Sequence, residues 1–245
     1  ASLGVDYLIY PEVLASQGIV ESLRKNWMRQ YLPFCNGEMI LLSVKVRSNS
    51  EIINKQFISG YFNHDKYRIV AIKRGNRTIL PKGHDQILSG DIVFFITNEE
   101  NLDFVRRQAG KEDFNIKEVI IAGGTKIAQK VVQTLPSHYH VKIIEPDREL
   151  CIALSDKLPN TLIINSDCRD VSVLENEGID TADAFVAVMP NSEANLLTCM
   201  VAKRYGVKKT IAEVENIDYF NLAESMDISA IVNKKTIAAS YIHQI

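Results

Sequence analysis

The chain has 245 residues, of which 46% are hydrophobic and 24% charged, a composition typical of a globular protein that excludes disorder, collagen and a coiled coil. Its 28 basic and 30 acidic residues give a formal charge of −2, so no overall basic field exists to recruit nucleic acid or an anionic membrane. Four widely spaced cysteines argue against a zinc site or a disulfide framework, and no run of about 18 apolar residues predicts direct membrane insertion.

The first thirty residues predict a strand followed by an amphipathic helix. The helix begins at Pro11, and its apolar face carries Val13, Val20, Leu23 and Trp27 at helical spacing. A helix without the sheet of its own domain would expose this face, so we expect another copy of the chain to cover it. The sequence therefore predicts a homodimer or a larger assembly.

The middle of the chain, residues 37–110, predicts a small α+β domain. Its apolar runs read as strands separated by turns, and residues 74–77 carry the turn signal of a hairpin. Two short helices are expected, over residues 51–57 and 99–108. We find no catalytic constellation in this segment. The expected strands cover residues 39–46, 67–73, 78–80 and 91–97.

From residue 117 onward, short β-branched runs alternate with helical patterns. The runs begin 19 to 26 residues apart, which leaves room for a crossover helix between them. Strands this apolar are covered on both faces, so the pattern predicts a doubly wound, parallel Rossmann-like sheet. The expected strands cover residues 118–122, 141–145, 161–165, 184–188, 210–214 and 229–232.

The two ends of the chain are similar to each other. Residues 5–19 align with residues 228–242, and their apolar positions coincide at an offset of 223. The match is short, and any two strand-then-helix segments share such a pattern. The alternative is that a longer parent protein repeats a two-domain unit. The chain begins with Ala1 and not Met, so we expect it to be an internal fragment.

The turn after the first strand of this sheet resembles a dinucleotide-binding turn. Gly123 and Ala128 occupy the first and last positions of the pattern GxGxxA, but Thr125 stands at the second glycine. Its β-branched side chain projects where phosphate oxygens would approach the backbone amides. Glu145 ends the second strand, where an acidic residue accepts the ribose hydroxyls. A packed turn with a solvated Glu145 remains the alternative.

Two further turns carry polar residues at strand ends. Asp167 follows the third strand, where it could contact an adenine or, as we favour, cap a helix over residues 169–177. Asn191 or Ser192 is expected to cap the helix after the fourth strand, with Glu193 near its positive end. These roles can be wholly structural.

Other reactive side chains give weak signals. His138 and His140 have a spacing that a metal ion can use, but we identify no third ligand, so no metal site is predicted. Cys151 and Cys168 are expected to be buried apolar residues and not nucleophiles. We find no catalytic triad, no pair of catalytic carboxylates and no Walker lysine. The sequence therefore predicts no catalytic residues.

Together these segments resemble the TrkA-like family of bacterial potassium-uptake regulators, which carry RCK (KTN) domains. The C-terminal half is similar over residues 119–128, 143–147, 165–167, 178–188 and 191–195. The middle segment resembles the smaller C-terminal domain of the family over residues 69–75, 81–83 and 88–93.

The resemblance implies a domain organisation. Residues 1–35 would end a first Rossmann-like RCK N-domain, residues 36–112 would form an RCK C-domain, and residues 116–245 would form a second RCK N-domain. Two copies of such a pair in the parent would account for the offset of 223.

The resemblance also implies a ligand site. NAD(H), ATP or ADP would bind at Gly123, Gly124, Thr125, Ala128, Glu145 and Asp167. Thr125 and Ser166 replace family glycines, and Glu213 stands where some members have a phosphate-binding arginine. An added carboxylate disfavours an anionic ligand, so we expect nucleotide binding at this second site to be weak or absent.

The family implies a regulatory function. The chain would belong to a cytoplasmic, non-enzymatic ring of subunits at the inner face of the plasma membrane, beneath a TrkH-like potassium channel subunit. The alternative is an NAD-dependent oxidoreductase domain. A dehydrogenase needs a proton-transfer residue near the nicotinamide and a substrate domain, and the sequence suggests neither.

Overall fold

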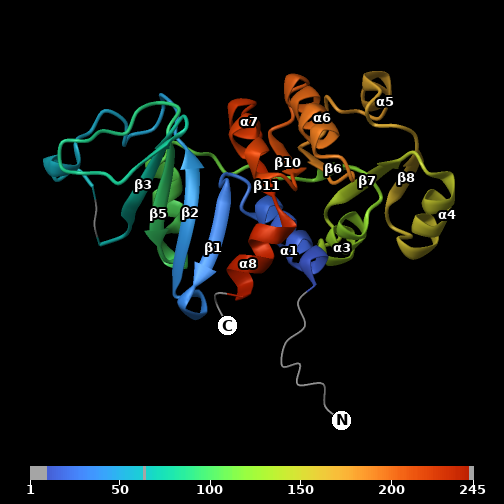
Figure 1. The fold of residues 1–245 in the computed structure, drawn as a ribbon, viewed down its shortest axis with the longest axis horizontal. Helices are drawn as coiled ribbons and strands as arrows, with labels where there is room; N and C mark the ends of the chain where they lie inside the picture. The colour runs from blue at the N-terminus through green and yellow to red at the C-terminus, as the bar shows by residue number, and fades with distance from the viewer. Residues whose placement is uncertain (1–9, 63–64, 243–245) are drawn as a thin grey trace, which may run out of the picture. The chain divides into compact units, whose positions relative to one another are not determined.

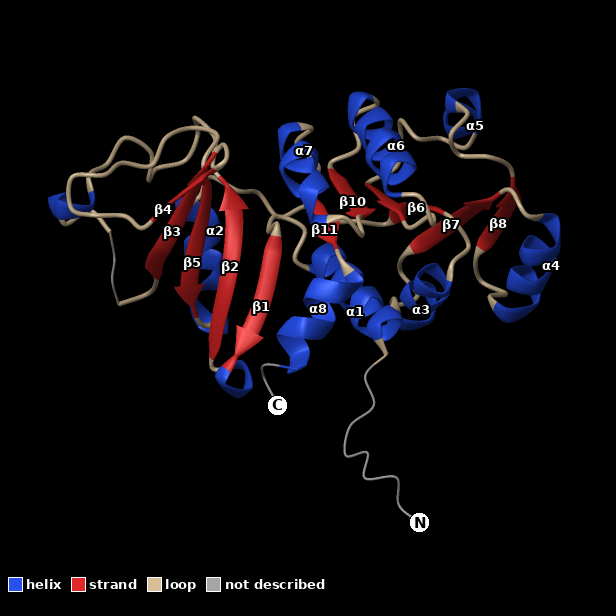
Figure 2. Cartoon of the chain, viewed as in Figure 1, coloured by secondary structure: helices blue, strands red, loops and turns tan. Residues whose placement is uncertain are grey.

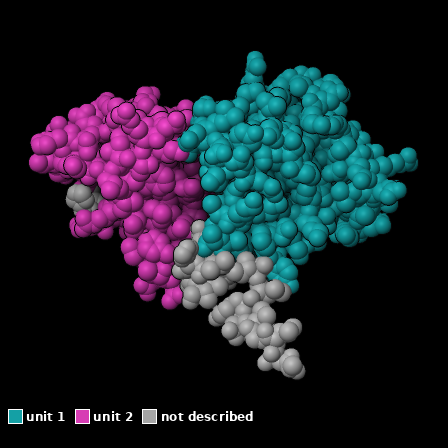
Figure 3. All heavy atoms as spheres, viewed as in Figure 1, with its two compact units in different colours: residues 1–23, 116–245 teal, residues 24–115 magenta. Residues whose placement is uncertain are grey.

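The computed structural model describes residues 10–62 and 65–242. The chain forms two compact units, residues 1–23 with 116–245 (unit 1) and residues 24–115 (unit 2), which Figure 3 shows in different colours. The strand expected before Pro11 lies outside the described residues. The origin of residues 1–35 in a preceding domain stays a prediction.

Unit 1 contains a six-stranded sheet in the order β11-β10-β9-β6-β7-β8, and every neighbouring pair is parallel. This confirms the predicted doubly wound fold, because the chain runs from β6 toward one edge and then from β9 toward the other. The strands are β6 (Glu118–Ala122), β7 (His140–Glu145), β8 (Leu162–Asn165), β9 (Ala184–Ala187), β10 (Lys209–Glu213) and β11 (Ala230–Val232).

Helices cover both faces of this sheet. Helices α1, α3, α4 and α8 lie on one face, and α5, α6 and α7 lie on the other (Figure 1). Every residue of β9 and β10 is buried, as expected for central strands of a covered parallel sheet. The helices are α1 (Pro11–Arg24), α3 (Lys126–Thr134), α4 (Arg148–Lys157), α5 (Val171–Asn176), α6 (Ser192–Arg204), α7 (Phe220–Ser225) after the 3-10 turn η4 (Ile217–Tyr219), and α8 (Lys234–Ile242).

The apolar face of α1 is covered by its own chain. Ala15, Ile19, Val20 and Leu23 are buried, and a Cβ on Gly18 would lie 3.6 Å from the Ile237 side chain of α8. The argument for a dimer from an uncovered helix face is therefore wrong, because unit 1 itself supplies the missing surface. The helix also ends at Arg24, and Trp27 packs on the core of unit 2.

Unit 2 is a five-stranded antiparallel sheet in the order β1-β2-β5-β3-β4, with helix α2 (Figure 2). The hairpin predicted at residues 74–77 is present, because Arg74 pairs with Arg77 across it. The elements are β1 (Gln30–Phe34), η1 (Cys35–Gly37), β2 (Met39–Lys45), η2 (Phe57–Ser59), β3 (Arg68–Arg74), β4 (Arg77–Ile79), β5 (Ile92–Thr97), η3 (Glu99–Asn101) and α2 (Leu102–Gln108).

Two predictions for unit 2 differ from the structure. Residues 51–57 do not form a helix, since Asn54 has a left-handed φ of 58° and Ile53 and Gln56 form isolated bridges to Ile87 and Gln86. The sequence does not predict the edge strand β1, because Pro33 cannot donate to a ladder and apolar residues do not alternate with polar ones in this segment. The helix expected over residues 99–108 is present as η3 and α2.

Candidate functional site

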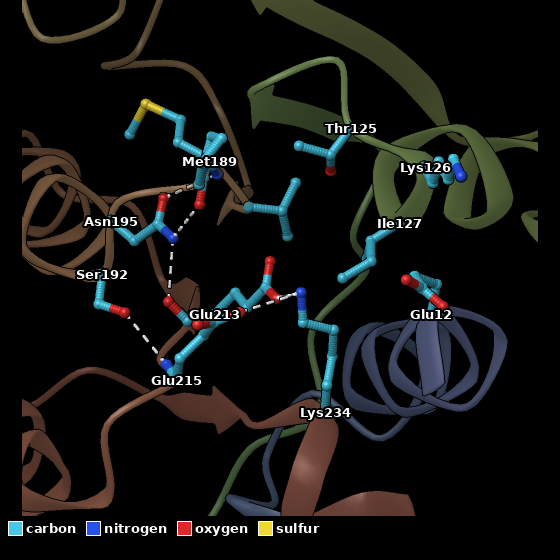
Figure 4. A pocket seen from close by; sticks show the side chains of 12 residues that line it. Glu12, Thr125, Lys126, Ile127, Met189, Ser192, Asn195, Glu213, Glu215 and Lys234 are labelled. Carbon is cyan, nitrogen blue, oxygen red and sulfur yellow. Dashed lines mark hydrogen bonds and ion pairs between the residues drawn. The ribbon is translucent and has the colours of Figure 1, made fainter. Parts of the chain in front are cut away.

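The strand order of unit 1 reverses between β6 and β9, and in such folds ligands bind outside the carboxyl ends of the strands at this point. A cavity of about 360 Å³ lies there, within the size range of small-molecule sites (Figure 4). Its lining comes from α1, the β6–α3 turn, the β9–α6 turn, the end of β10 and the start of α8. The residues are Glu12, Thr125, Lys126, Ile127, Val188, Met189, Pro190, Ser192, Asn195, Glu213, Glu215 and Lys234.

The glycines of the β6–α3 turn are enclosed by the protein. Gly123 has a φ of +99°, and a Cβ there would lie 3.1 Å from backbone atoms of Met189. A Cβ on Gly124 would lie 2.5 Å from Leu154 Cδ1. Gly123 therefore requires glycine for its backbone conformation and packing, and a side chain at position 124 would displace Leu154, whether or not a phosphate approaches the turn.

Glu145 is held against this turn by backbone amides. Its Oε2 accepts a hydrogen bond from Gly124 N at 2.7 Å, and its Oε1 accepts one from Asp147 N at 2.9 Å. The side chain is buried at the end of β7. A ribose that binds Glu145 must share these oxygens or displace the amides, and the Gly124 amide is already used by the protein.

Thr125 is the N-cap of α3, with Oγ1 3.5 Å from Ala128 N. It is the one predicted site residue that lines the cavity, whereas Ala128 is fully buried in the first turn of the helix. The capping hydrogen bond is long, so it holds the hydroxyl weakly.

Asp167 lies in the loop after β8 and pairs with Arg169, whose Nη2 is 2.6 Å from Oδ2. Hydrogen bonds from Arg169 hold the pKa of Asp167 below its usual value. The predicted capping role is wrong, because α5 begins at Val171 and Asp170 is its cap. Asn191 caps α6, as one of the two expected alternatives.

The opposite wall of the cavity is fixed by Asn195 of α6. Its Oδ1 accepts from Met189 N, and its Nδ2 donates to the carbonyls of Met189 and Glu213, each at 2.9 Å. Ser192 Oγ accepts from Glu215 N at 3.1 Å. Figure 4 shows these bonds joining the β9–α6 turn to the end of β10. The Glu213–Glu215 segment therefore has a fixed backbone.

Lys234, the first residue of α8, lies between two carboxylates of this segment. Its Nζ is 3.0 Å from Glu213 Oε1 and 3.2 Å from Glu215 Oε1. Glu213 is 5% exposed, and burial raises its pKa against the opposing effect of Lys234. With Glu12, three carboxylates line the cavity against Lys234 and the exposed Lys126.

The raised pKa of Glu213 predicts a pH-dependent stability. A carboxyl whose pKa is raised by folding contributes stability below its unfolded pKa, and this contribution is lost as the pH rises through the folded pKa. We expect Glu213→Gln to raise the free energy of unfolding by roughly 0.5–2 kcal/mol at pH 7, and by less at pH 4. Denaturant unfolding at both pH values measures this. Glu215→Gln, at an exposed carboxylate, is the control. If Glu213→Gln stabilises the chain more at pH 4 than at pH 7, relative to the native chain at the same pH, the predicted direction of the pH dependence is wrong.

The sequence did not single out most of the cavity lining. The sequence marks Glu213 only because some family members have an arginine at this position. It does not predict that Lys234, Glu215, Met189 and Asn195 line one cavity. One signal was present, because each follows or lies near the carboxyl end of β9, β10 or β11. Glu12 carried no such signal, since its helix was assigned to another domain.

The remaining reactive side chains lie apart from this cavity. His140 Nδ1 is 2.6 Å from Glu118 Oε1, and the His138 ring packs on Tyr139. Within residues 10–62 and 65–242, no three His, Cys, Asp or Glu side chains converge as a metal site. Cys151 and Cys168 are buried as predicted, and burial raises the pKa of Cys168 to about 11. No helix in the described part of the chain is long and apolar enough to cross a bilayer.

Comparison with known proteins agrees with this architecture. The TrkA-N domain family matches residues 119–234, and the TrkA-C domain family matches residues 41–110. The chain is 29% identical over 243 residues to the Trk system potassium uptake protein TrkA of Halomonas elongata, covering 98% of this chain and 53% of that protein. The chain thus spans about half the length of such relatives.

Solved structures share the fold. The GsuK RCK domain matches 98% of this chain and 51% of its own, with a TM-score of 0.62 and 10% identity. A GsuK channel bound to NAD matches 95% of this chain and 41% of its own, with a TM-score of 0.58 and 11% identity.

The fold and the cavity define a class of protein: a doubly wound parallel α/β domain with a cavity at its switch point, together with a small α+β domain in the same chain. The matches to the TrkA-N and TrkA-C domain families and to TrkA proteins make this class more specific. Residues 41–110 match the TrkA-C domain family, residues 119–234 match the TrkA-N domain family, and nearly the whole chain is similar to TrkA proteins.

Proposed function

We propose that the chain is part of a non-enzymatic regulatory subunit that controls potassium transport. The observation that carries this proposal is the order of a TrkA-C domain and then a TrkA-N domain, aligned over 98% of the chain with a relative named as a potassium uptake protein. The cavity at the switch point supplies a place for a regulatory ligand.

Deletion of the gene tests this function. We expect the deletion strain to grow poorly at limiting potassium and to take up potassium slowly, and the intact gene to restore both. Unchanged potassium uptake, together with turnover of NADH on a metabolite panel, would support the alternative, an NAD-dependent oxidoreductase domain.

The ligand that we propose for the cavity is NAD(H) or an adenine nucleotide, bound weakly. The turn after β6, Glu145 at the end of β7 and the start of α3 lie where a dinucleotide is held in this fold. The enclosure of Gly124 and its bond to Glu145 oppose tight binding, as do the three carboxylates of the cavity. Among the predicted contacts, Asp167 is tied to Arg169 and needs to be released.

We expect this chain to bind these nucleotides no tighter than roughly 100 μM, about −5.5 kcal/mol, and Thr125→Gly to tighten binding. Glycine removes the branched side chain that faces the cavity, and losing a cap to glycine costs only a few tenths of a kcal/mol. Calorimetric titration with NADH, ATP and ADP measures both. Thr125→Ser, which keeps a Cβ and a hydroxyl, is the control. Low-micromolar affinity in the native chain, or a Thr125→Gly variant that binds no better, contradicts the prediction.

We also propose that the protein assembles as an oligomer on a membrane potassium channel or transporter subunit, at the inner face of the cytoplasmic membrane. Exposed apolar side chains on neighbouring elements of unit 1 support a protein partner: Leu197 of α6, Ile217 of η4 and Leu222 of α7 are 52%, 62% and 43% exposed. Light scattering across micromolar concentrations tests the assembly, and a strictly monomeric chain would count against it.

A further inference from the structure

The cavity of unit 1 is negatively charged on one side. Glu213 at the end of β10 and Glu215 just after it contribute two carboxylates, and Lys234 is the cation that pairs with both. Because Lys234 is shared by Glu213 and Glu215, this side keeps an excess of negative charge. Figure 4 draws Lys126 of α3 and Glu12 of α1, a further cation and a further carboxylate of the lining, on the side away from Glu215.

These carboxylates are held in place. Asn195 fixes the Glu213 carbonyl at 2.9 Å, and the buried Asn233 donates to the Glu215 carbonyl at 2.8 Å. Glu213 Oε1 lies 3.0 Å from Lys234 Nζ, and Glu215 Oε1 lies 3.2 Å from the same ammonium group, so two carboxylates share one positive charge. A pair of carboxylates that share one cation favours a further positive charge nearby.

The fold determines which part of a dinucleotide would lie near Glu213 and Glu215. In a doubly wound sheet the pyrophosphate lies at the first βα turn, and the acidic residue ending the second strand binds the adenosine ribose. Here these are the β6–α3 turn and Glu145, so the adenosine half belongs over β7 and β8. The other half, with its nicotinamide, then extends across the switch point toward β9 and β10, where Glu213 and Glu215 lie.

We propose that this cavity prefers the oxidised dinucleotide, NAD⁺, over NADH, and that Glu213 and Glu215 are the specificity-determining residues. The nicotinamide ring carries a positive charge in NAD⁺ and none in NADH, while the rest of the two molecules is the same. The carboxylates therefore stabilise the oxidised ring alone. They also repel the terminal phosphate that ATP would extend in this direction. This inference rests on the proposed nucleotide binding.

The expected preference follows from Coulomb's law. One unit of excess negative charge at about 6–8 Å from the ring, in a medium with an effective dielectric constant of about 40, changes affinity by roughly five- to tenfold. Partial screening in an open cavity lowers this, so we expect a preference for NAD⁺ of about three- to tenfold.

Titration of the full chain with NAD⁺, NADH and ADP-ribose tests the proposal. ADP-ribose lacks the nicotinamide, so it reports the affinity of the part that NAD⁺ and NADH have in common. We expect NAD⁺ to bind about three- to tenfold more tightly than NADH, and Glu213→Gln to bring the ratio close to one by weakening NAD⁺ alone. A loss of folding would weaken all three ligands equally.

A matched control is available on α6. Glu193 bonds to Tyr219 and does not line the cavity, so Glu193→Gln is expected to keep the native ratio. If Glu213→Gln does not fold, the exposed Glu215→Gln replaces it. Equal affinity for the two dinucleotides, a preference for NADH, or a ratio unchanged in both cavity variants would overturn the proposal. Failure of all three ligands to bind would instead overturn the proposed ligand, and with it this preference.

Discussion

Replacing Asp91 with Ala is expected to lower the free energy of unfolding of unit 2 by about 2–4 kcal/mol. The Asp91 side chain is 2% exposed and accepts two hydrogen bonds from Arg74, at 2.9 and 2.8 Å, and one from Leu88 N at 2.8 Å. The substitution leaves the Leu88 amide without its acceptor and Arg74 without its carboxylate. Because the Arg74 side chain is 40% exposed, it can regain water, which limits the loss.

The chain provides its own reporter for this change. Its single tryptophan, Trp27, packs on the core of unit 2, so its fluorescence follows the unfolding of that unit during denaturant titration. Asp103→Ala removes an exposed partner of Arg106 and Arg107 and is expected to cost much less than Asp91→Ala. Equal losses in the two variants would show that the buried pair contributes no more than an exposed one.

Hydrophobic patterning was sufficient to predict the sheet of unit 1. All six expected strands are present, since runs such as residues 118–122 and 184–188 are apolar on both faces and can only be central strands. The sequence was less informative where backbone conformation decides the structure. Residues 51–57 have the composition of a helix, but the left-handed Asn54 and the bridge from Ile53 to Ile87 depend on a segment distant in sequence.

Only the β6–α3 turn and Glu145 could be predicted from the sequence as parts of the candidate site. Gly123 and Glu145 stand at positions that the fold assigns to any dinucleotide turn, so a motif finds them. A motif does not predict the hydrogen bond from Gly124 N to the Glu145 carboxylate, because this bond depends on the orientation of the Glu145 side chain. The cluster of Glu12, Glu213 and Lys234 joins segments that are more than 200 residues apart, and sequence spacing cannot bring these together.

Gly124→Ala is expected to destabilise unit 1 by roughly 1–3 kcal/mol, through overpacking alone. The φ of Gly124 is not in the left-handed region, so alanine can adopt the backbone conformation. Its Cβ, however, would lie 2.5 Å from Leu154 Cδ1 and 3.3 Å from Glu145 Oε2. Leu154 is fully buried, so it cannot move aside into solvent, and a shift of Glu145 would strain its bond to the Gly124 amide.

A double-mutant cycle identifies the cause. Leu154→Ala alone is expected to cost about 2–5 kcal/mol because it leaves a cavity, but it also removes the atom that meets the new Cβ. The double variant should therefore be more stable than the sum of the two single losses predicts, by at least about 0.5 kcal/mol. Gly18→Ala in α1 is the control, because its Cβ would make an ordinary 3.6 Å contact with Ile237 and a helix gains up to about 1 kcal/mol from the change. Denaturant unfolding followed by circular dichroism measures all four variants. Strictly additive losses would show that contact with Leu154 is not the reason that alanine is unfavourable at this turn.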